Sequence, residues 1–381
     1  MRILLVGEYS RLHNSLKEGL QKHGHEVVLL GTGDGFKNFP SDISIKPTIF
    51  SKPFFRSVAK AFDKLFNIQL IELEYYFKLK KIIPNLTGFD VVQLINEQSL
   101  KTSPKHEIQL VSQLLKQNKK VFLLSCGIDY ISLKYALDKK LEYSVLSPYF
   151  EDESLKKHYR FILKYVTAPY KKLHEFLFNN VNGVIASDFD YHIPLQGNSK
   201  YLGLIPNPIN TDKIEYKPLD IKDKIVIFHG INSMNYIKKG NQFFEEALNH
   251  IKEKYNDKVE IIVTKNLPYN KYTKAIARCH ILLDQVYAYD QGYNALEAMA
   301  KGKVVFTGAE QEWLDYYNLK ENSVAINALP NTNDIFSKLE WLINNPEKIT
   351  EISKNARAFV EKEHHYLNIA NMYVKQWEGN M

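Results

Sequence analysis

Residues 2–30, RILLVGEYSRLHNSLKEGLQKHGHEVVLL, contain the pattern of a strand, a helix and a second strand in succession. The opening apolar run predicts a buried strand, and the three leucines that follow recur at the four-residue spacing of one helix face. Gly24 ends this predicted helix, and the next apolar run, 25–30, predicts the second strand. Two strands joined by a helix form a βαβ unit, in which the strands are parallel. The segment therefore predicts an α/β protein built on a parallel sheet.

The same alternation of strand and helix patterns continues along the rest of the chain. In the first half, strands are predicted at 89–95, 120–125 and 183–187, and helices at 106–117 and through much of 130–180. The pattern restarts in the second half, with strands predicted at 224–230, 259–264, 280–285 and 303–308, helices at 240–254 and from Asn294, and two closing helices. Between the halves, YLGLIPNPIN (201–210) has two prolines and two asparagines and predicts an interdomain hinge. A chain of 381 residues is also longer than one core usually organises, so we expect two doubly wound α/β domains.

Composition narrows the class of protein. The two cysteines, Cys126 and Cys279, form no CxxC pair, which excludes a disulfide framework and a thiolate zinc site and favours the cytoplasm. The N-terminal apolar run is too short for a signal peptide, and no apolar stretch predicts a membrane span.

Net charge is +7 and is unevenly distributed. Residues 1–200 carry 28 Lys and Arg against 20 Asp and Glu, whereas the remainder carries 22 against 23. The basic half suggests an anionic partner, such as a membrane surface or an anionic lipid substrate. Nucleic acid is disfavoured, because the chain has no zinc-finger spacing, RNP-type aromatic run or Arg-rich segment.

Three short patterns point to common functions but fit structural roles better. The turn after the first strand has one glycine, so the dinucleotide fingerprint is absent, and the Gly31–Gly35 cluster is interpreted as a loop. Asp188 and Asp190 have the D-x-D form of some metal sites, but an acid after a strand is commonly a helix cap, and we expect no metal. The adjacent His364 and His365 have no matching ligand spacing and are expected at the surface.

The most informative stretch is YAYDQGYNALEAMAKGKVVFTG, Tyr287–Gly308. Asn294 and Glu297 are spaced as a capping box at the start of a helix. That interpretation does not explain Gly292 before the helix or Gly302 after it. Helix amides and a carboxylate at the end of a parallel strand are the groups needed to hold a phosphate and a sugar hydroxyl.

The pattern G-x-x-x-L-E-A-M-A-x-G-x-V-V, preceded by I-P-N-P-I-N and by a strand, a Gly turn and Lys-Gly at 224–240, resembles retaining GT-B glycosyltransferases of the family-four type. The resemblance is strongest over 202–310. It implies two Rossmann-like doubly wound domains facing across a cleft: an acceptor domain at 1–203, a nucleotide-sugar donor domain at 204–365, and a helix at 366–381 that returns to the first domain. It implies no cofactor.

The resemblance also implies donor-site residues. Glu297 matches the glutamate that holds the donor ribose, but the family's first glutamate would fall at Tyr289, and Asp290 is the nearest acid. Lys239 matches the lysine that faces the diphosphate, while the family's arginine is missing near Ile231 or Asn232. Lys238, Lys265, His229 or backbone amides are the alternatives for the missing charge. The full donor-binding set predicted is Gly230, Asn232, Lys239, Lys265, Gln285, Tyr289, Asp290, Tyr293, Asn294 and Glu297.

On the acceptor side, LLSCGID (123–129) resembles the family's strand ending in His-Gly-x-Asp, with Cys126 in place of the histidine. Each of these residues taken singly also fits a structural role. The predicted acceptor-side residues are Ser10, His13, Glu97, Cys126 and Asp129, and the predicted catalytic residues are Asp129, Lys239 and Glu297.

Residues 52–66, KPFFRSVAKAFDKLF, predict an amphipathic helix. Phe54, Phe55, Val58, Phe62, Leu65 and Phe66 fall on one face, and Lys52, Arg56, Lys60 and Lys64 form a basic stripe. Two interpretations stay open: core packing with a solvated basic edge, or a membrane-surface helix that reaches a lipid-linked acceptor.

These patterns predict a cytoplasmic glycosyltransferase, with a peripheral membrane contact as an added expectation. It would move a sugar from a nucleotide-diphosphate donor to a glycan or lipid-linked acceptor, in surface polysaccharide or glycoconjugate synthesis. A non-catalytic relative that binds a nucleotide sugar or glycan is the first alternative, because two family residues are missing. A sugar-nucleotide epimerase of related architecture is the second.

Overall fold

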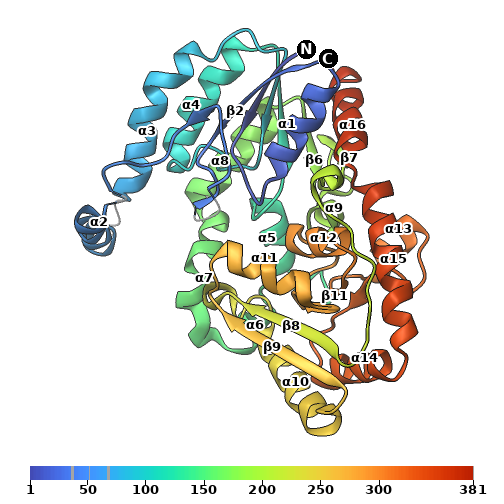
Figure 1. The fold of residues 1–381 in the computed structure, drawn as a ribbon. Helices are drawn as coiled ribbons and strands as arrows, with labels where there is room; N and C mark the ends of the chain where they lie inside the picture. Colours follow the sequence, from blue (N-terminus) through green and yellow to red (C-terminus); the bar gives the residue numbers. More distant parts are fainter. Residues whose placement is uncertain (36–37, 51, 67–68, 381) are drawn as a thin grey trace.

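The computed structural model describes residues 1–35, 38–50, 52–66 and 69–380 (Figure 1). The side chains of Lys60, Lys64, Leu65 and Phe66, which belong to the predicted amphipathic helix, lie outside the description, as do those of Tyr269 and Asn270.

Two parallel sheets organise the chain, as the strand–helix alternation predicts. The first has the order β3-β2-β1-β4-β5-β6-β7, and the second the order β12-β11-β10-β8-β9. All strand pairs in both sheets are parallel. The strands are β1 (Arg2–Val6), β2 (Glu26–Gly31), β3 (Ile43–Ser44), β4 (Val91–Leu94), β5 (Lys120–Ser125), β6 (Gly183–Ala186), β7 (Tyr201–Leu204), β8 (Ile225–Ile231), β9 (Val259–Lys265), β10 (Ile281–Leu283), β11 (Val304–Thr307) and β12 (Ile326–Asn327).

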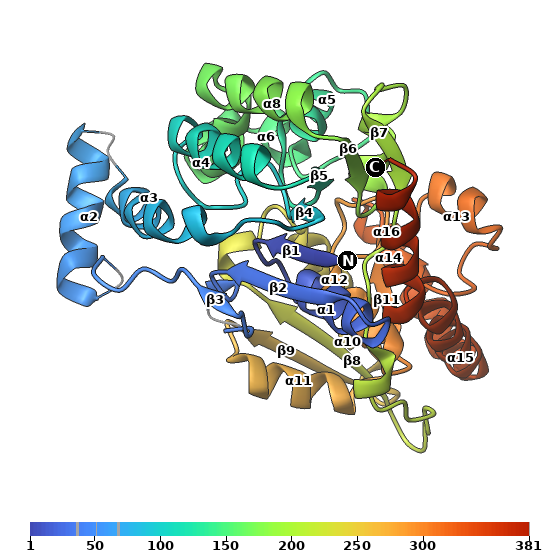
Figure 2. The same cartoon turned by 90° about the horizontal axis from the view of Figure 1, so that it is seen from above.

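Helices cover the two sheets (Figures 1 and 2). Preceding β8 in the chain are α1 (Leu12–Lys22), α2 (Pro53–Phe66), α3 (Leu70–Ile82), α4 (Pro104–Gln117), α5 (Tyr130–Leu137), α6 (Ser147–Glu151), α7 (Lys156–Leu163), α8 (Ala168–Asn180) and α9 (Phe189–Leu195); of these, α2 extends away from the sheet. Following β8 are α10 (Asn241–Tyr255), α11 (Tyr269–Arg278), α12 (Tyr293–Ala300), α13 (Gln311–Tyr317), α14 (Thr332–Asn344), α15 (Pro346–Glu363) and α16 (Tyr366–Glu378). No helix in the described part of the chain has the length and apolar character needed to span a membrane.

Strand β1 shows why its sequence is a continuous apolar run. Successive side chains of a strand point to opposite faces of the sheet. Ile3 and Leu5 pack into one buried cluster, whereas Leu4 and Val6 pack into another. Because both faces of a parallel sheet are covered, both sets of side chains must be apolar.

Helix α16 packs beside α1 on the first sheet (Figure 1). Trp377 is fully buried and donates a hydrogen bond from its indole Nε1 to Oε1 of Gln93 at 3.0 Å. On α1, a Cβ atom at Gly19 would lie 2.4 Å from the Tyr366 carbonyl oxygen, so only glycine permits this close approach. Helix α16, which follows the second sheet in the chain, is thus fixed to the first sheet.

Two segments cross between the sheets and are hydrogen-bonded to each other. The Ile209 N–H donates to the His364 carbonyl at 2.7 Å, and the Tyr366 N–H donates to the Ile209 carbonyl at 3.1 Å. The expectation that His364 lies at the surface is wrong, because the hinge segment covers it. Its Nδ1 lies 2.9 Å from the Asn207 carbonyl, and burial lowers the pKa of His364 to about 4. His365 remains partly exposed.

Two further expectations differ from the structure. Residues 201–204, expected to belong to the hinge, form strand β7 at the edge of the first sheet, so the crossing begins after Leu204. After β11 the described chain contains β12 and four helices rather than two helices. The domain limits at 203/204 and 365/366 stay predictions.

Candidate functional site

A cavity of about 780 Å³ lies between the two sheets. It is reached by the carboxyl ends of the parallel strands β8, β9 and β10, the edge at which α/β sheets present their loops to ligands. The first sheet's segment contributes Ser10 and Phe39. Eight of the predicted site residues line this cavity: Ser10, Gly230, Asn232, Lys239, Gln285, Tyr293, Asn294 and Glu297.

A chain of polar contacts fixes Lys239 in the cavity wall. Its Nζ lies 2.8 Å from Oδ1 of Asp284, which follows β10 and is buried. The same Oδ1 accepts a hydrogen bond from Nδ2 of Asn294 at 2.7 Å, and the Tyr272 hydroxyl donates to Oδ1 of Asn294 at 2.9 Å. The lysine is therefore held in one position, with part of its charge offset by Asp284.

The predicted capping box is wrong. The capping box requires Asn294 as the N-cap, but helix α12 begins at Tyr293 with Gly292 as its N-cap, two residues earlier. The Asn294 side chain is bonded to Tyr272 and Asp284, and no side chain caps the helix. Glu297 lines the cavity, so the motif residues serve the cavity wall instead of the helix start.

Asp284 and Tyr272 are members of this wall that the sequence analysis did not identify. Asp284 could have been found, because it is the first polar residue after strand β10. Tyr272 had no such signal. A Cβ at Gly230 would lie 2.5 Å from the Tyr272 ring, so a glycine near the end of β8 makes room for this ring.

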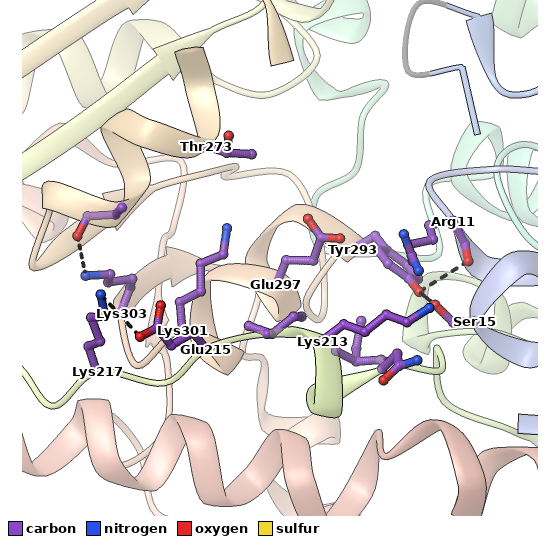
Figure 3. Close-up of a pocket in the computed structure, with 14 residues that line it drawn as sticks. Arg11, Ser15, Lys213, Glu215, Lys217, Thr273, Tyr293, Glu297, Lys301 and Lys303 are labelled. Atoms are coloured by element: carbon purple, nitrogen blue, oxygen red, sulfur yellow. Dashed lines mark hydrogen bonds and ion pairs between the residues drawn. The ribbon is translucent and has the colours of Figure 1, made fainter. Parts of the chain in front are cut away.

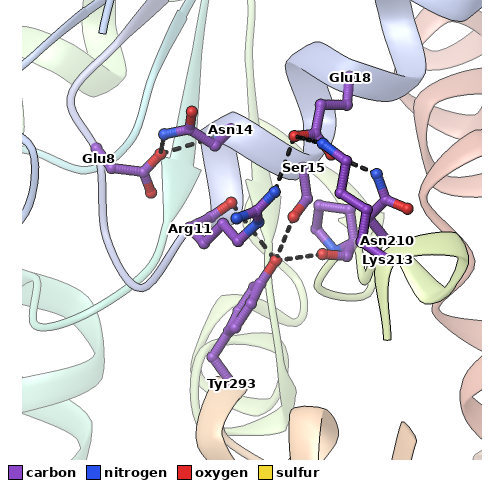
Figure 4. Close-up of polar contacts among 9 residues, drawn as sticks. Glu8, Arg11, Asn14, Ser15, Glu18, Asn210, Lys213 and Tyr293 are labelled. Carbon is purple, nitrogen blue, oxygen red and sulfur yellow. Dashed lines mark hydrogen bonds and ion pairs between the residues drawn. The ribbon is translucent and has the colours of Figure 1, made fainter. Parts of the chain in front are cut away.

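Tyr293 connects the two halves of the molecule. Its hydroxyl lies 2.7 Å from Oγ of Ser15 on α1, and it also contacts the Arg11 and Pro208 carbonyl oxygens (Figure 4). Nearby, Glu18 of α1 pairs with Arg11 at 2.8 Å (Figure 4). One tyrosine of α12 therefore contacts both α1 and the hinge.

Three predicted donor residues do not line the cavity. Lys265, at the end of β9, is exposed. Tyr289 and Asp290 lie instead where the two halves of the chain meet. The Phe189 N–H donates to Oδ2 of Asp290 at 3.0 Å, and the Tyr289 hydroxyl accepts a hydrogen bond from the Glu142 N–H at 3.0 Å.

Asp188, Asp190 and Asp290 form a carboxyl cluster whose oxygen atoms lie within 4.8 Å of one another, an arrangement that could hold a metal ion. Burial raises the pKa of Asp190 to about 7, and burial together with the neighbouring carboxyls raises the pKa values of Asp188 and Asp290 well above their ordinary value. Asp188 is the N-cap residue of α9, but its side chain forms no capping bond, contrary to expectation.

The predicted acceptor-side residues other than Ser10 do not line the cavity either. Oδ1 of Asp129 caps helix α5 by accepting from the Ser132 N–H at 2.8 Å. Glu97 is buried and lies 2.7 Å from Nδ1 of His174. These contacts favour the structural roles that the sequence analysis left open.

The remaining two acceptor-side residues, His13 and Cys126, are uncharged at neutral pH because they are buried. His13 is buried with Nδ1 2.8 Å from the Gly7 carbonyl, and burial lowers its pKa to about 3. Burial raises the pKa of the Cys126 thiol to about 12, so it is not a thiolate nucleophile at neutral pH.

Comparison with known proteins identifies the architecture. HepE of Anabaena, solved in complex with UDP-glucose, superposes over 100% of both chains with a TM-score of 0.60 and 11% identity. Sucrose-phosphate synthase of Thermosynechococcus elongatus superposes over 100% of this chain and 98% of its own, with a TM-score of 0.62 and 15% identity. The chain has a GT-B fold.

The GT-B neighbours include more than one kind of protein. UDP-GlcNAc 2-epimerase of Neisseria meningitidis, solved with UDP-GlcNAc, covers 100% of both chains at a TM-score of 0.56 and 13% identity. Residues 238–375 match the family model described as glycosyl transferase-like. This segment begins just before Lys239 and includes all of α12. No curated protein sequence matches the chain.

Proposed function

We propose that this GT-B protein transfers a sugar from a nucleoside diphosphate donor to a hydroxyl group of a glycan or lipid-linked glycan. The observation that carries the proposal is the cavity at the strand ends, where Lys239 and Glu297 lie in one wall and Ser10 in the opposite half of the chain. The glycosyl transferase-like match over 238–375 supports it, and so do neighbours solved with UDP-sugars.

The proposal gives a chemical role to three side chains of the cavity wall and to nearby backbone amides. The Glu297 carboxylate accepts hydrogen bonds from the ribose hydroxyls. The Lys239 ammonium meets the negative charge that develops on the leaving diphosphate, and backbone amides after β8 and at the start of α12 add donors. Asp284 keeps the lysine pointing into the cavity.

We propose retention of configuration on the basis of the family resemblance. The bond between the sugar C1 and the diphosphate oxygen breaks, and the acceptor oxygen bonds to C1 on the same face. The acceptor proton passes to the leaving phosphate oxygen, so no side chain has to act as a general base. This accords with the structural bonds of Asp129 and Glu97.

A thermal-shift screen of nucleotides and nucleotide sugars tests the donor proposal. A ligand that binds the folded state raises its melting temperature. The donor identified in this way is then incubated with the protein, and nucleoside diphosphate release and sugar products are measured. Release of diphosphate with transfer or hydrolysis supports the proposal; conversion to an epimeric sugar nucleotide would indicate an epimerase.

A non-catalytic binding protein is the second candidate. The Lys239 charge is already paired with Asp284, and neither Ile231 nor Asn232, which both line the cavity, is an arginine. Donor binding without turnover, with every acceptor class tested, would favour this candidate.

We also propose a cytoplasmic location with a peripheral contact to an anionic membrane through α2. This helix extends away from both sheets (Figures 1 and 2). Phe54 is 75% exposed and Phe55 40%, while Lys52 and Arg56 are exposed beside them. Exposed aromatic rings next to basic side chains suit the interface of an anionic bilayer.

A further inference from the structure

A second cavity, of about 320 Å³, lies next to the donor cavity and shares Tyr293 and Glu297 with it. Its walls come from α1, α11, α12 and residues 209–217, which begin at the end of the predicted hinge, so we call it the hinge cavity (Figure 3). Its volume is near the lower end of the range of small-molecule sites. Of the side chains that line it, the proposed transfer reaction assigns a role to Glu297 alone.

Basic side chains dominate the hinge cavity. Five of them line it, against two carboxylates, Glu215 and Glu297 (Figure 3). Two of the five, Arg11 and Lys213, share the single carboxylate of Glu18, at 2.8 and 2.7 Å. The basic residues are Arg11, Lys213, Lys217, Lys301 and Lys303.

Lys301 and Lys303 have no ion-pair partner among the described residues. Lys303 is only 5% exposed, and its Nζ donates to the Ala277 carbonyl at 3.1 Å (Figure 3). Burial and the charge of Lys301 both lower the pKa of Lys303. A buried ammonium without a counter-ion is costly, so this wall of the cavity is suited to a bound anion.

We propose that the hinge cavity binds a small phosphate-bearing anion. A phosphate group carries close to two negative charges at neutral pH and several acceptor oxygens, which match the two lysines that lack carboxylate partners. Arg11 is the N-cap residue of α1, whereas Lys301 follows α12. An anion held between them contacts both halves of the chain beside the hinge.

Isothermal titration with inorganic phosphate and with glucose 6-phosphate tests the site on the full chain. UDP is kept at saturating concentration, so that phosphate does not bind in the donor cavity. Lys301→Gln is expected to weaken anion binding about tenfold, and Lys301→Glu more strongly, because each loses a charged hydrogen bond. Lys354→Gln, at an exposed lysine of α15 outside the cavity, is the matched control and should bind as wild type.

The outcomes distinguish a phosphate ester from free phosphate as the ligand. They also test the anion site separately from the proposed sugar transfer. Tighter binding of glucose 6-phosphate than of phosphate indicates an ester ligand, and equal binding indicates the free anion. Equal weakening in Lys354→Gln, or unchanged binding in both Lys301 variants with normal melting, overturns the site. The experiment measures anion binding, so its result is valid even if the protein transfers no sugar. If UDP does not bind, wild type and Lys301→Gln are titrated without nucleotide, and weaker anion binding by the variant again supports the site.

Discussion

Asp190 and Asp290 form a reciprocal pair of contacts, in which each carboxyl accepts a hydrogen bond from the backbone N–H of the residue that precedes the other aspartate. Oδ2 of Asp290 lies 3.0 Å from the Phe189 nitrogen, and Oδ1 of Asp190 lies 3.4 Å from the Tyr289 nitrogen. These paired contacts join α9 of the first sheet's segment to the loop before α12. They place two carboxyl groups in a buried contact between the halves of the chain.

This contact predicts that the protein loses stability as the pH rises from about 4 to 7. The pKa of Asp190 is raised to about 7, above its ordinary value of 3.8, so the folded state holds its proton while the unfolded state has released it. The contribution of this group is therefore complete below about pH 4 and is lost as the pH rises through the folded-state pKa. Burial and the neighbouring carboxyls also raise the pKa of Asp290, so Asp290→Asn removes one of the titrating groups. The variant should flatten this slope and raise stability at pH 8 relative to wild type, measured by urea unfolding across the pH range.

Asp257→Asn, at an exposed acid of the second sheet's segment, is the control and should leave the slope unchanged. The amide oxygen that Asp290→Asn introduces can still accept from the Phe189 N–H, so the contact itself survives. A slope as steep in Asp290→Asn as in wild type would show that Asp290 is ionised in the folded protein at neutral pH.

Glu297→Gln should weaken donor binding about tenfold or more, because a carboxylate that accepts two hydroxyl hydrogen bonds becomes a neutral amide. The helix start should be unaffected, since Gly292 rather than a side chain caps α12. Donor titration and thermal melting are measured on the same samples. Glu312→Gln, on the exposed side of α13, is the control. Unchanged donor affinity would exclude Glu297 as the ribose ligand.

Lys239→Met should reduce turnover by about a hundredfold, the usual effect of removing one group that stabilises developing charge. Binding of the free nucleoside should change little, because the lysine is proposed to face the diphosphate. Steady-state kinetics and nucleoside titration check the two parts. Lys238→Met is the matched control, since this neighbouring lysine does not line the cavity.

Removing Lys239 also leaves the buried Asp284 without its cation, which lowers stability independently of catalysis. The double variant Lys239→Met/Asp284→Asn removes this unpaired charge. If activity returned in the double variant, the loss in Lys239→Met would come from the stranded carboxylate and not from the diphosphate contact.

Helix α2 should bring the protein to anionic vesicles at low salt and release it at high salt. Each basic residue near an anionic surface contributes about 1 kcal/mol, which salt screens. Changing Phe54 and Phe55 to Ser, or Arg56, Lys60 and Lys64 to Gln, should abolish co-sedimentation while transfer to a soluble acceptor continues. Met372→Ser, at an exposed apolar residue of α16, is the control. Wild type that ignores anionic vesicles at low salt would refute the membrane contact.

Periodicity predicted the elements of the fold because its signal is local. The apolar runs of β1 and β5 match strands whose faces are both covered, and their ends meet at one edge of the sheet. The same edge rule pointed to Glu297, which lines the cavity, whereas Asn232 was assigned from the family resemblance. Residues that follow strands could be assigned to the site without knowledge of the packing.

The errors arise where a distant segment decides the role of a residue. Asn294 has the spacing of a helix cap, but Tyr272 and Asp284 bind its side chain. The local sequence around His364 is typical of a surface residue, but in the structure the hinge segment covers this side chain. Asp290 lies near the motif in sequence, yet it bonds to the Phe189 backbone of the other half. These partners are distant in the sequence, so a local pattern could not predict them.

The position of α16 has a consequence for how the chain folds during synthesis. Ile369, Tyr373 and Trp377 complete the apolar cluster on one face of the first sheet, although α16 follows every other helix in the chain. Helix α1 also packs on this face, but while the ribosome is still making the second sheet the part that α16 covers remains exposed. The first half can therefore reach its final packing only after α16 has left the ribosome exit tunnel, and until then a chaperone that binds apolar surface would have a site there.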